Sequence, residues 1–130
     1  MKERIEKELE LIRTMFPNIK YTENGHWFYI PSYSLPDGWN RAATEIAFQI
    51  KDGYPATKPY AFYVPNGILY NEQAPKNYKA SANNQPPFEG IWGELSWTIS
   101  SPWQPTSDIA KGSNLLNWML SFENRFKEGA

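Results

Sequence analysis

The chain contains no cysteine among its 130 residues. This absence excludes disulfide bonds, metal sites built from thiolates, and catalysis by a thiol nucleophile. Histidine is almost as scarce, because His26 is the only one. A zinc site made of protein side chains is therefore not expected, and a Ser-His-Asp triad would need His26 itself as its base.

Long apolar runs and clusters of like charge are also missing. No stretch of about 18 apolar residues occurs, so no membrane-spanning helix is expected. Residues 1–16 mix charged and apolar side chains and lack the apolar core of a secretion signal. The 13 basic and 14 acidic residues are spread along the chain, and the net charge is −1. A surface for nucleic acid or a membrane is therefore not expected, and the expected location is the cytoplasm.

Aromatic residues, proline and glycine are abundant. Phenylalanine, tyrosine and tryptophan together make up 16% of the chain, which also holds 11 prolines and 8 glycines. So many turn-forming residues argue against a bundle of long helices. The length fits one domain, residues 1–130, built around one hydrophobic core.

Apolar residues at helical spacing predict a helix near each end of the chain. The first covers about residues 2–16, with Leu11 and Met15 widening its apolar stripe and Glu and Lys on a solvated face. The second starts at about Ser113, whose hydroxyl is expected to cap its N-terminus. Its expected buried stripe is Leu115, Trp118, Met119, Phe122 and Phe126.

The middle of the chain has the pattern of antiparallel strands. Asn24-Gly25 lies between two runs of β-forming residues, which favours a hairpin with a type I′ turn. In that hairpin His26 begins the second strand, in a surface or cross-strand role. Further strands are expected at 44–50 and 60–64, with a short extended piece within 91–100. Residues 66–90 have the composition of one long loop. This order predicts an α+β domain in which helices cover a meander.

One turn resembles a segment of the ubiquitin-conjugating enzymes. In that family a strand ends in a Tyr-Pro-x-x-Pro-Pro turn, and the next strand follows. The sequence FQIKDGYPATKPYAFYV supplies Tyr54, Pro55 and Pro59 at matching positions, while Lys58 replaces the first proline of the closing pair. Proline fixes φ, so a turn of this composition is stiff.

The resemblance continues towards the C-terminus. Asn71 falls on the asparagine of the family's His-Pro-Asn motif, whose other two positions are not conserved here. The family's catalytic cysteine lies in a Gly-x-x-Cys segment before a Trp-x-Pro. Here the chain has Gly93-Glu94-Leu95-Ser96, followed by Trp103-Gln104-Pro105. Ser96 therefore stands at the cysteine position, although about 25 residues separate it from Asn71, several times the usual gap.

The resemblance implies a fold and an activity. The implied fold is UBC-like: an N-terminal helix, an antiparallel meander of about four strands, a long active-site loop and a C-terminal helix. The departures point to the divergent bacterial branch, which is encoded beside a ubiquitin-like protein and an activating enzyme. The implied activity is that of an acyl carrier, which accepts the C-terminus of the ubiquitin-like protein on Ser96 and passes it to an amine of a protein substrate. The activating enzyme consumes the ATP, so no cofactor is expected.

A serine in this role needs support, because a hydroxyl is a weak nucleophile and an oxyester resists aminolysis. Asn71 would donate a hydrogen bond to the developing oxyanion. Asn83, Asn84 and Asp108 are further candidates, although loop positions and a helix cap explain them equally well. Trp103, together with the other tryptophans near Ser96, would shield an ester from water or simply belong to the core.

Four interpretations of Ser96 remain open from the sequence. It is a native nucleophile that forms an oxyester, or it marks a catalytically inactive domain that binds a ubiquitin-like protein or an activating enzyme. It is an engineered replacement of a cysteine, made to trap a complex. Or it is an ordinary strand residue, and the alignment with the family has slipped.

Overall fold

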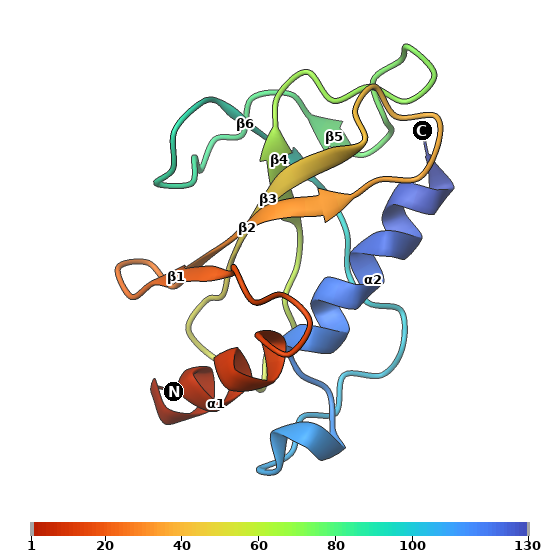
Figure 1. Ribbon diagram of the computed structural model, residues 1–130. Helices are drawn as coiled ribbons and strands as arrows, with labels where there is room; N and C mark the ends of the chain where they lie inside the picture. The colour runs from red at the N-terminus through yellow and green to blue at the C-terminus, as the bar shows by residue number, and fades with distance from the viewer. Residues whose placement is uncertain (1, 130) are drawn as a thin grey trace.

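The computed structural model describes residues 2–129 and has an α+β fold, as the sequence predicts (Figure 1). Six strands form one antiparallel sheet in the order β1-β2-β3-β4-β6-β5. Two α-helices and a short 3₁₀-helix complete the fold. The elements are α1 (Lys2–Ile12), β1 (Lys20–Thr22), β2 (Trp27–Ser34), β3 (Ala43–Gln49), β4 (Phe62–Pro65), β5 (Tyr78–Lys79), β6 (Trp92–Leu95), η1 (Ile109–Lys111) and α2 (Leu115–Glu128).

The main core lies between the sheet and α2, which runs along one face of the sheet in Figure 1. Alternate residues of a strand point to opposite faces, so each central strand sends one set of apolar side chains to this helix. Phe62 of β4 stacks on Phe122 of α2 with ring centroids 4.2 Å apart. The predicted apolar stripe of α2 is confirmed, because all five of its side chains are fully buried: Leu115, Trp118, Met119, Phe122 and Phe126.

The first helix is shorter than the sequence predicts. It ends at Ile12, and after a four-residue bond from Arg13 N to Leu9 O the bonds from Thr14 N to Leu11 O and from Met15 N to Ile12 O span only three residues. This tightening turns Met15 outwards, and it is 55% exposed. The prediction that Met15 widens the buried stripe is therefore wrong, because the helix stops before a fourth turn.

The second helix begins at Leu115 and is capped by Asn114 rather than by Ser113. The Asn114 side chain accepts a hydrogen bond from Asn117 N at 2.9 Å, and the Asn117 side chain accepts one from Asn114 N at 3.1 Å. This reciprocal arrangement is a capping box made of two asparagines. The Ser113 hydroxyl instead accepts a hydrogen bond from Gln104 N at 2.8 Å.

The predicted hairpin is confirmed as β1 and β2, but its turn differs from type I′. Positive φ values occur at Gly25 (82°) and His26 (53°), whereas a type I′ turn requires them at Asn24 and Gly25. His26 therefore belongs to the turn, and the second strand starts at Trp27. The Nδ1 of His26 lies 2.6 Å from the Tyr21 hydroxyl, which gives this histidine the cross-strand role expected from the sequence.

The stretch 66–90 is not one free loop, and the sheet has six strands rather than about four. The two-residue strand β5 pairs with β6. The chain between β5 and β6 packs on the outer face of the sheet, defined here as the face that carries Trp27, Tyr63 and Trp92. There the Gln85 side chain bonds to both the N–H and the C=O of Trp92, at 2.8 and 2.9 Å. Side-chain bonds to the backbone hold this segment in place. Such bonds leave no periodic pattern of apolar residues in the sequence, so the packing was not predicted.

Candidate functional site

Ser96 comes directly after β6. Its backbone N–H donates to Asn77 O at 2.9 Å, which extends the pairing of β5 with β6 by one residue. Leu95 is fully buried in the core, so strand alternation places Ser96 on the outer face. The side chain is half-buried, and within residues 2–129 its hydroxyl makes no hydrogen bond to another residue. The hydroxyl is thus neither sealed in the core nor held by a partner.

Asn71 lies in a different place. Its side chain is exposed, and its backbone N–H donates to Gly38 O at 2.8 Å. It lines an open hollow with Gly38 and Trp39, and Ser96 is not part of that lining. In the described part of the chain no hydrogen bond joins Asn71 to Ser96. The two residues that the sequence pairs as a catalytic unit are therefore not brought together by any contact of the structure.

The predicted Tyr-Pro turn is fixed by Trp103. Tyr54 is buried, its peptide bond to Pro55 is cis, and Pro59 is buried as well. The indole Nε1 of Trp103 donates to Pro55 O at 2.7 Å, and the Trp103 ring packs beside that of Tyr54. Two residues singled out separately from the sequence thus form one structural unit, in which Trp103 anchors the turn.

We expect Trp103→Phe to lower the free energy of unfolding by about 1 kcal/mol, because it removes one hydrogen bond and leaves the Pro55 carbonyl without its donor. Urea unfolding followed by circular dichroism measures the change. The matched control is Gln104→Ala at the exposed neighbouring position, expected to stay within about 0.5 kcal/mol of the wild type. Equal effects of both changes would contradict the anchoring role.

Two of the other support candidates, Asp108 and Asn84, have structural roles. The Asp108 side chain caps η1 by accepting a hydrogen bond from Ala110 N at 3.1 Å, which is the capping alternative that its sequence position allowed. Asn83 and Asn84 are exposed loop residues, and Asn84 Nδ2 donates to the Gln49 side chain at 2.9 Å. These contacts fasten the loop and the turn rather than facing Ser96.

A buried carboxylate, Glu8, was missed by the sequence reasoning. Glu8 is only 1% exposed, although its helix position suggested a solvated face. Its Oε2 accepts from Arg4 Nε at 2.9 Å and from the Tyr54 hydroxyl, and its Oε1 accepts from Leu115 N at 2.6 Å. Burial, followed by the charge of Glu8, raises the pKa of Tyr54, which keeps this hydroxyl a donor. Glu8 thus joins α1, the Tyr-Pro turn and the start of α2.

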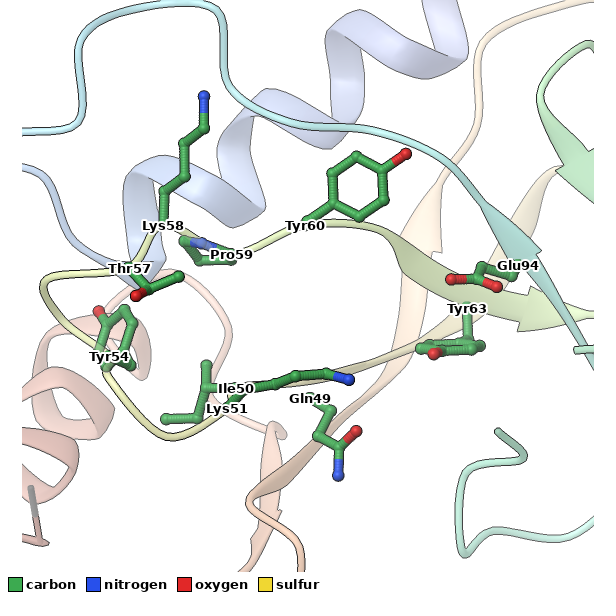
Figure 2. A pocket seen from close by; sticks show the side chains of 10 residues that line it. All are labelled: Gln49, Ile50, Lys51, Tyr54, Thr57, Lys58, Pro59, Tyr60, Tyr63 and Glu94. Atoms are coloured by element: carbon green, nitrogen blue, oxygen red, sulfur yellow. The ribbon is translucent and has the colours of Figure 1, made fainter. Parts of the chain in front are cut away.

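A cleft of about 290 Å³ opens where β3 and β4 separate (Figure 2). After β3, Ile50 N donates to His26 O at 3.1 Å, towards β2. Before β4, Ala61 N donates to Trp97 O at 2.8 Å, towards the segment that follows β6. The two sides of the hairpin therefore bond to different neighbours, and the space between them stays open.

The cleft reaches β6, the strand that ends directly before Ser96. Glu94, two residues before Ser96, lines it on one side in Figure 2. The Thr98 hydroxyl donates to Pro59 O at 3.3 Å, so the segment after Ser96 runs beside the cleft wall. The wall also presents the rings of Tyr60, which is 62% exposed, and Tyr63, together with the side chains of Lys51 and Lys58. Apolar walls with a few polar and charged groups are typical of binding clefts.

The described residues show neither a metal site nor a spanning helix. Across residues 2–129, no three side chains of histidine, cysteine, aspartate or glutamate gather closely enough to hold a metal ion. The helices of this part of the chain are too short and too polar to cross a bilayer. Comparison of the chain with family models, curated proteins and solved structures finds no match. The case for a function therefore rests on the site itself.

Proposed function

We propose that this protein is a ubiquitin-conjugating-like acyl carrier whose acceptor atom is the Ser96 hydroxyl. The observation that carries the proposal is the placement of Ser96. Ser96 is half-buried on the outer face of the sheet, and its hydroxyl has no hydrogen-bond partner among residues 2–129. It follows Glu94, which lines the cleft, by two residues. The order of the Tyr-Pro turn, Ser96 and Trp103 in the sequence supports the same family.

The proposed reaction has two steps. In the first, the Ser96 Oγ attacks the activated C-terminal carbonyl of a ubiquitin-like protein. The new C–O bond replaces the bond to the activating enzyme, whose leaving atom takes the hydroxyl proton. In the second, an uncharged amine of a protein substrate attacks the ester. The C–N bond forms, the C–O bond breaks, and a proton from the nitrogen returns to the serine oxygen. Both steps pass through an oxyanion, which requires hydrogen-bond donors.

The cleft supplies a path for the tail that is transferred. A ubiquitin-like protein delivers an extended C-terminal segment, and its last residue must reach Ser96. Tyr60 and Tyr63 offer flat surfaces for such a segment, while Lys58 and Glu94 offer charged partners along it. Holding the tail in a cleft converts the attack into an intramolecular step, which is where positioning contributes most to rate.

The test is the detection of a covalent adduct. The protein is incubated with ATP and with the ubiquitin-like protein and activating enzyme encoded by the neighbouring genes. We expect an adduct that survives thiol reductant and is cleaved by mild alkali, as an oxyester is. Ser96→Ala removes the adduct completely, whereas the control Ser100→Ala, at an exposed hydroxyl of the same segment, leaves it unchanged. Equal adduct with Ser96→Ala and wild type would refute the carrier role.

A second candidate is a binding module that holds the same ubiquitin-like protein without chemistry. It is favoured by one observation, the separate location of Asn71 and Ser96. In that case the wild type binds the partner, as measured by calorimetry, but gives no adduct, and Ser96→Ala binds it with the same affinity.

A further inference from the structure

We propose that Asn77, rather than Asn71, donates the side-chain hydrogen bond to the oxyanion at Ser96. This inference rests on the proposed acyl transfer and names a residue of the same site. In the β5–β6 pairing, Lys79 lies opposite Glu94 and Tyr78 lies opposite Leu95. The next pair in this register is Asn77 and Ser96, and it is joined by the bond from Ser96 N to Asn77 O at 2.9 Å.

The register also decides on which face of the sheet Ser96 lies. Leu95 is fully buried, and Tyr78 packs against the same main core. Ser96 therefore belongs to the outer face, onto which the Glu94 side of the cleft opens. Asn77 lies just outside β5 and has a left-handed backbone, so its place beside Ser96 rests on the backbone bond between the two residues. That bond holds the asparagine next to the serine, where its amide can reach a group bound on the hydroxyl.

The amide of Asn77 is available, and its backbone is held in place. Asn77 is exposed, and its side chain makes no hydrogen bond to any other residue in the range 2–129. The preceding carbonyl, Lys76 O, accepts a bond from the buried guanidinium of Arg125 at 2.7 Å. The other end of that guanidinium donates to Gly129 O at 2.8 Å. A donor whose backbone is fixed before the reaction stabilises an oxyanion without first having to reorganise.

Chemically, Asn77 takes part without being altered. When the Ser96 Oγ–C bond forms, negative charge develops on the carbonyl oxygen, and Asn77 Nδ2–H donates to it. The charge disappears when the leaving group departs, and the serine proton goes to that leaving group. The same donor serves the second step, in which the amine replaces the serine oxygen.

The backbone of Asn77 makes a clean test possible. Its φ is 54°, in the left-handed region that glycine adopts freely, and Asn71 has a comparable φ of 48°. Asn77→Gly therefore deletes the amide while keeping the backbone conformation, and Asn71→Gly is its matched control. We expect Asn77→Gly to slow formation of the alkali-labile adduct by about 10²–10³-fold, the usual loss for one oxyanion donor. Asn71→Gly is expected to keep the wild-type rate.

Three further readouts separate the outcomes. Asn77→Gly should keep the Tm and the non-covalent affinity for the ubiquitin-like protein. Loss of a residue with a purely structural role would lower both. Asn77→Asp, similar in size but without the amide donor, should be as slow as Asn77→Gly. A wild-type rate with Asn77→Gly, or a loss found with Asn71→Gly instead, overturns the assignment and leaves the carrier role intact. Absence of any adduct with the wild type overturns both proposals.

Discussion

Replacing Glu8 by alanine is expected to cost about 3–5 kcal/mol of unfolding free energy, the range found when one member of a buried ion pair is removed. Three donors lose their acceptor at once: the Arg4 guanidinium, the Tyr54 hydroxyl and the Leu115 N–H. Each belongs to a different part of the fold, so no local rearrangement can satisfy all three. Urea unfolding at pH 7 measures the loss as a lower midpoint at an unchanged slope.

The same helix supplies the control. Glu10 is exposed, and Glu10→Ala is expected to change the unfolding free energy by no more than about 0.5 kcal/mol. Glu8→Gln keeps one oxygen acceptor and the shape of the side chain, so its loss should fall between those of the two alanine variants. If Glu8→Ala and Glu10→Ala were equally mild, the carboxylate would not be joining the three elements.

Glu8 shows where sequence reasoning about this fold stops. The apolar stripes of both helices are correct to within a few residues, because burial against one sheet face imposes a helical period that is visible in one dimension. The polar face of α1 looks the same whether water or another segment covers it. Glu8 is buried because the Tyr-Pro turn and the start of α2 approach it, and both lie far away in the sequence. Only its i, i+4 spacing from Arg4 gave a local sign.

The candidate site, too, could be predicted from the sequence only in part. The Tyr-Pro turn and Trp103 were identified from residue types, since prolines and tryptophans in that order are recognisable without a structure. The pairing that brings Asn77 beside Ser96 was missed because β5 is two residues long and pairs with a strand well downstream, and no periodicity marks so short an element. Asn71 was chosen from the spacing of a family motif. About 25 residues separate it from Ser96, so that spacing does not predict whether the two side chains meet.

Stability and the proposed chemistry depend on the same turn. Glu8 holds Tyr54 from the core side, and Trp103 holds the Pro55 carbonyl from the segment that follows Ser96. The turn between β3 and β4 forms one wall of the cleft, so these two contacts also hold that wall in place. Under the proposed function a fixed wall is useful, because positioning of the tail lowers the barrier only when the cleft keeps its shape.

Ser96→Cys is expected to change the chemistry of the adduct completely while leaving the fold intact. The half-buried position has no hydrogen-bond partner to lose in the described part of the chain, so a thiol fits with little cost. The adduct becomes a thioester, which is cleaved by reductant, and it forms roughly tenfold faster or more because a thiol is the better nucleophile. Its rate of formation should rise from pH 6.5 to pH 8.5, since the thiolate is the reacting form and its ordinary pKa is about 8.5.

Gel electrophoresis with and without reductant checks this change, and mild alkali applied to the wild-type adduct is the comparison. The adduct of Asn77→Gly in the Ser96→Cys background should again form more slowly, because a thioester passes through the same oxyanion. If only Ser96→Cys forms an adduct, the serine is an inactive replacement at a thiol site and the oxyester step is wrong. If neither protein forms one, residue 96 is not the acceptor. The identity of the bond at this single position thus separates a serine carrier from a silenced thiol carrier and from a domain without chemistry.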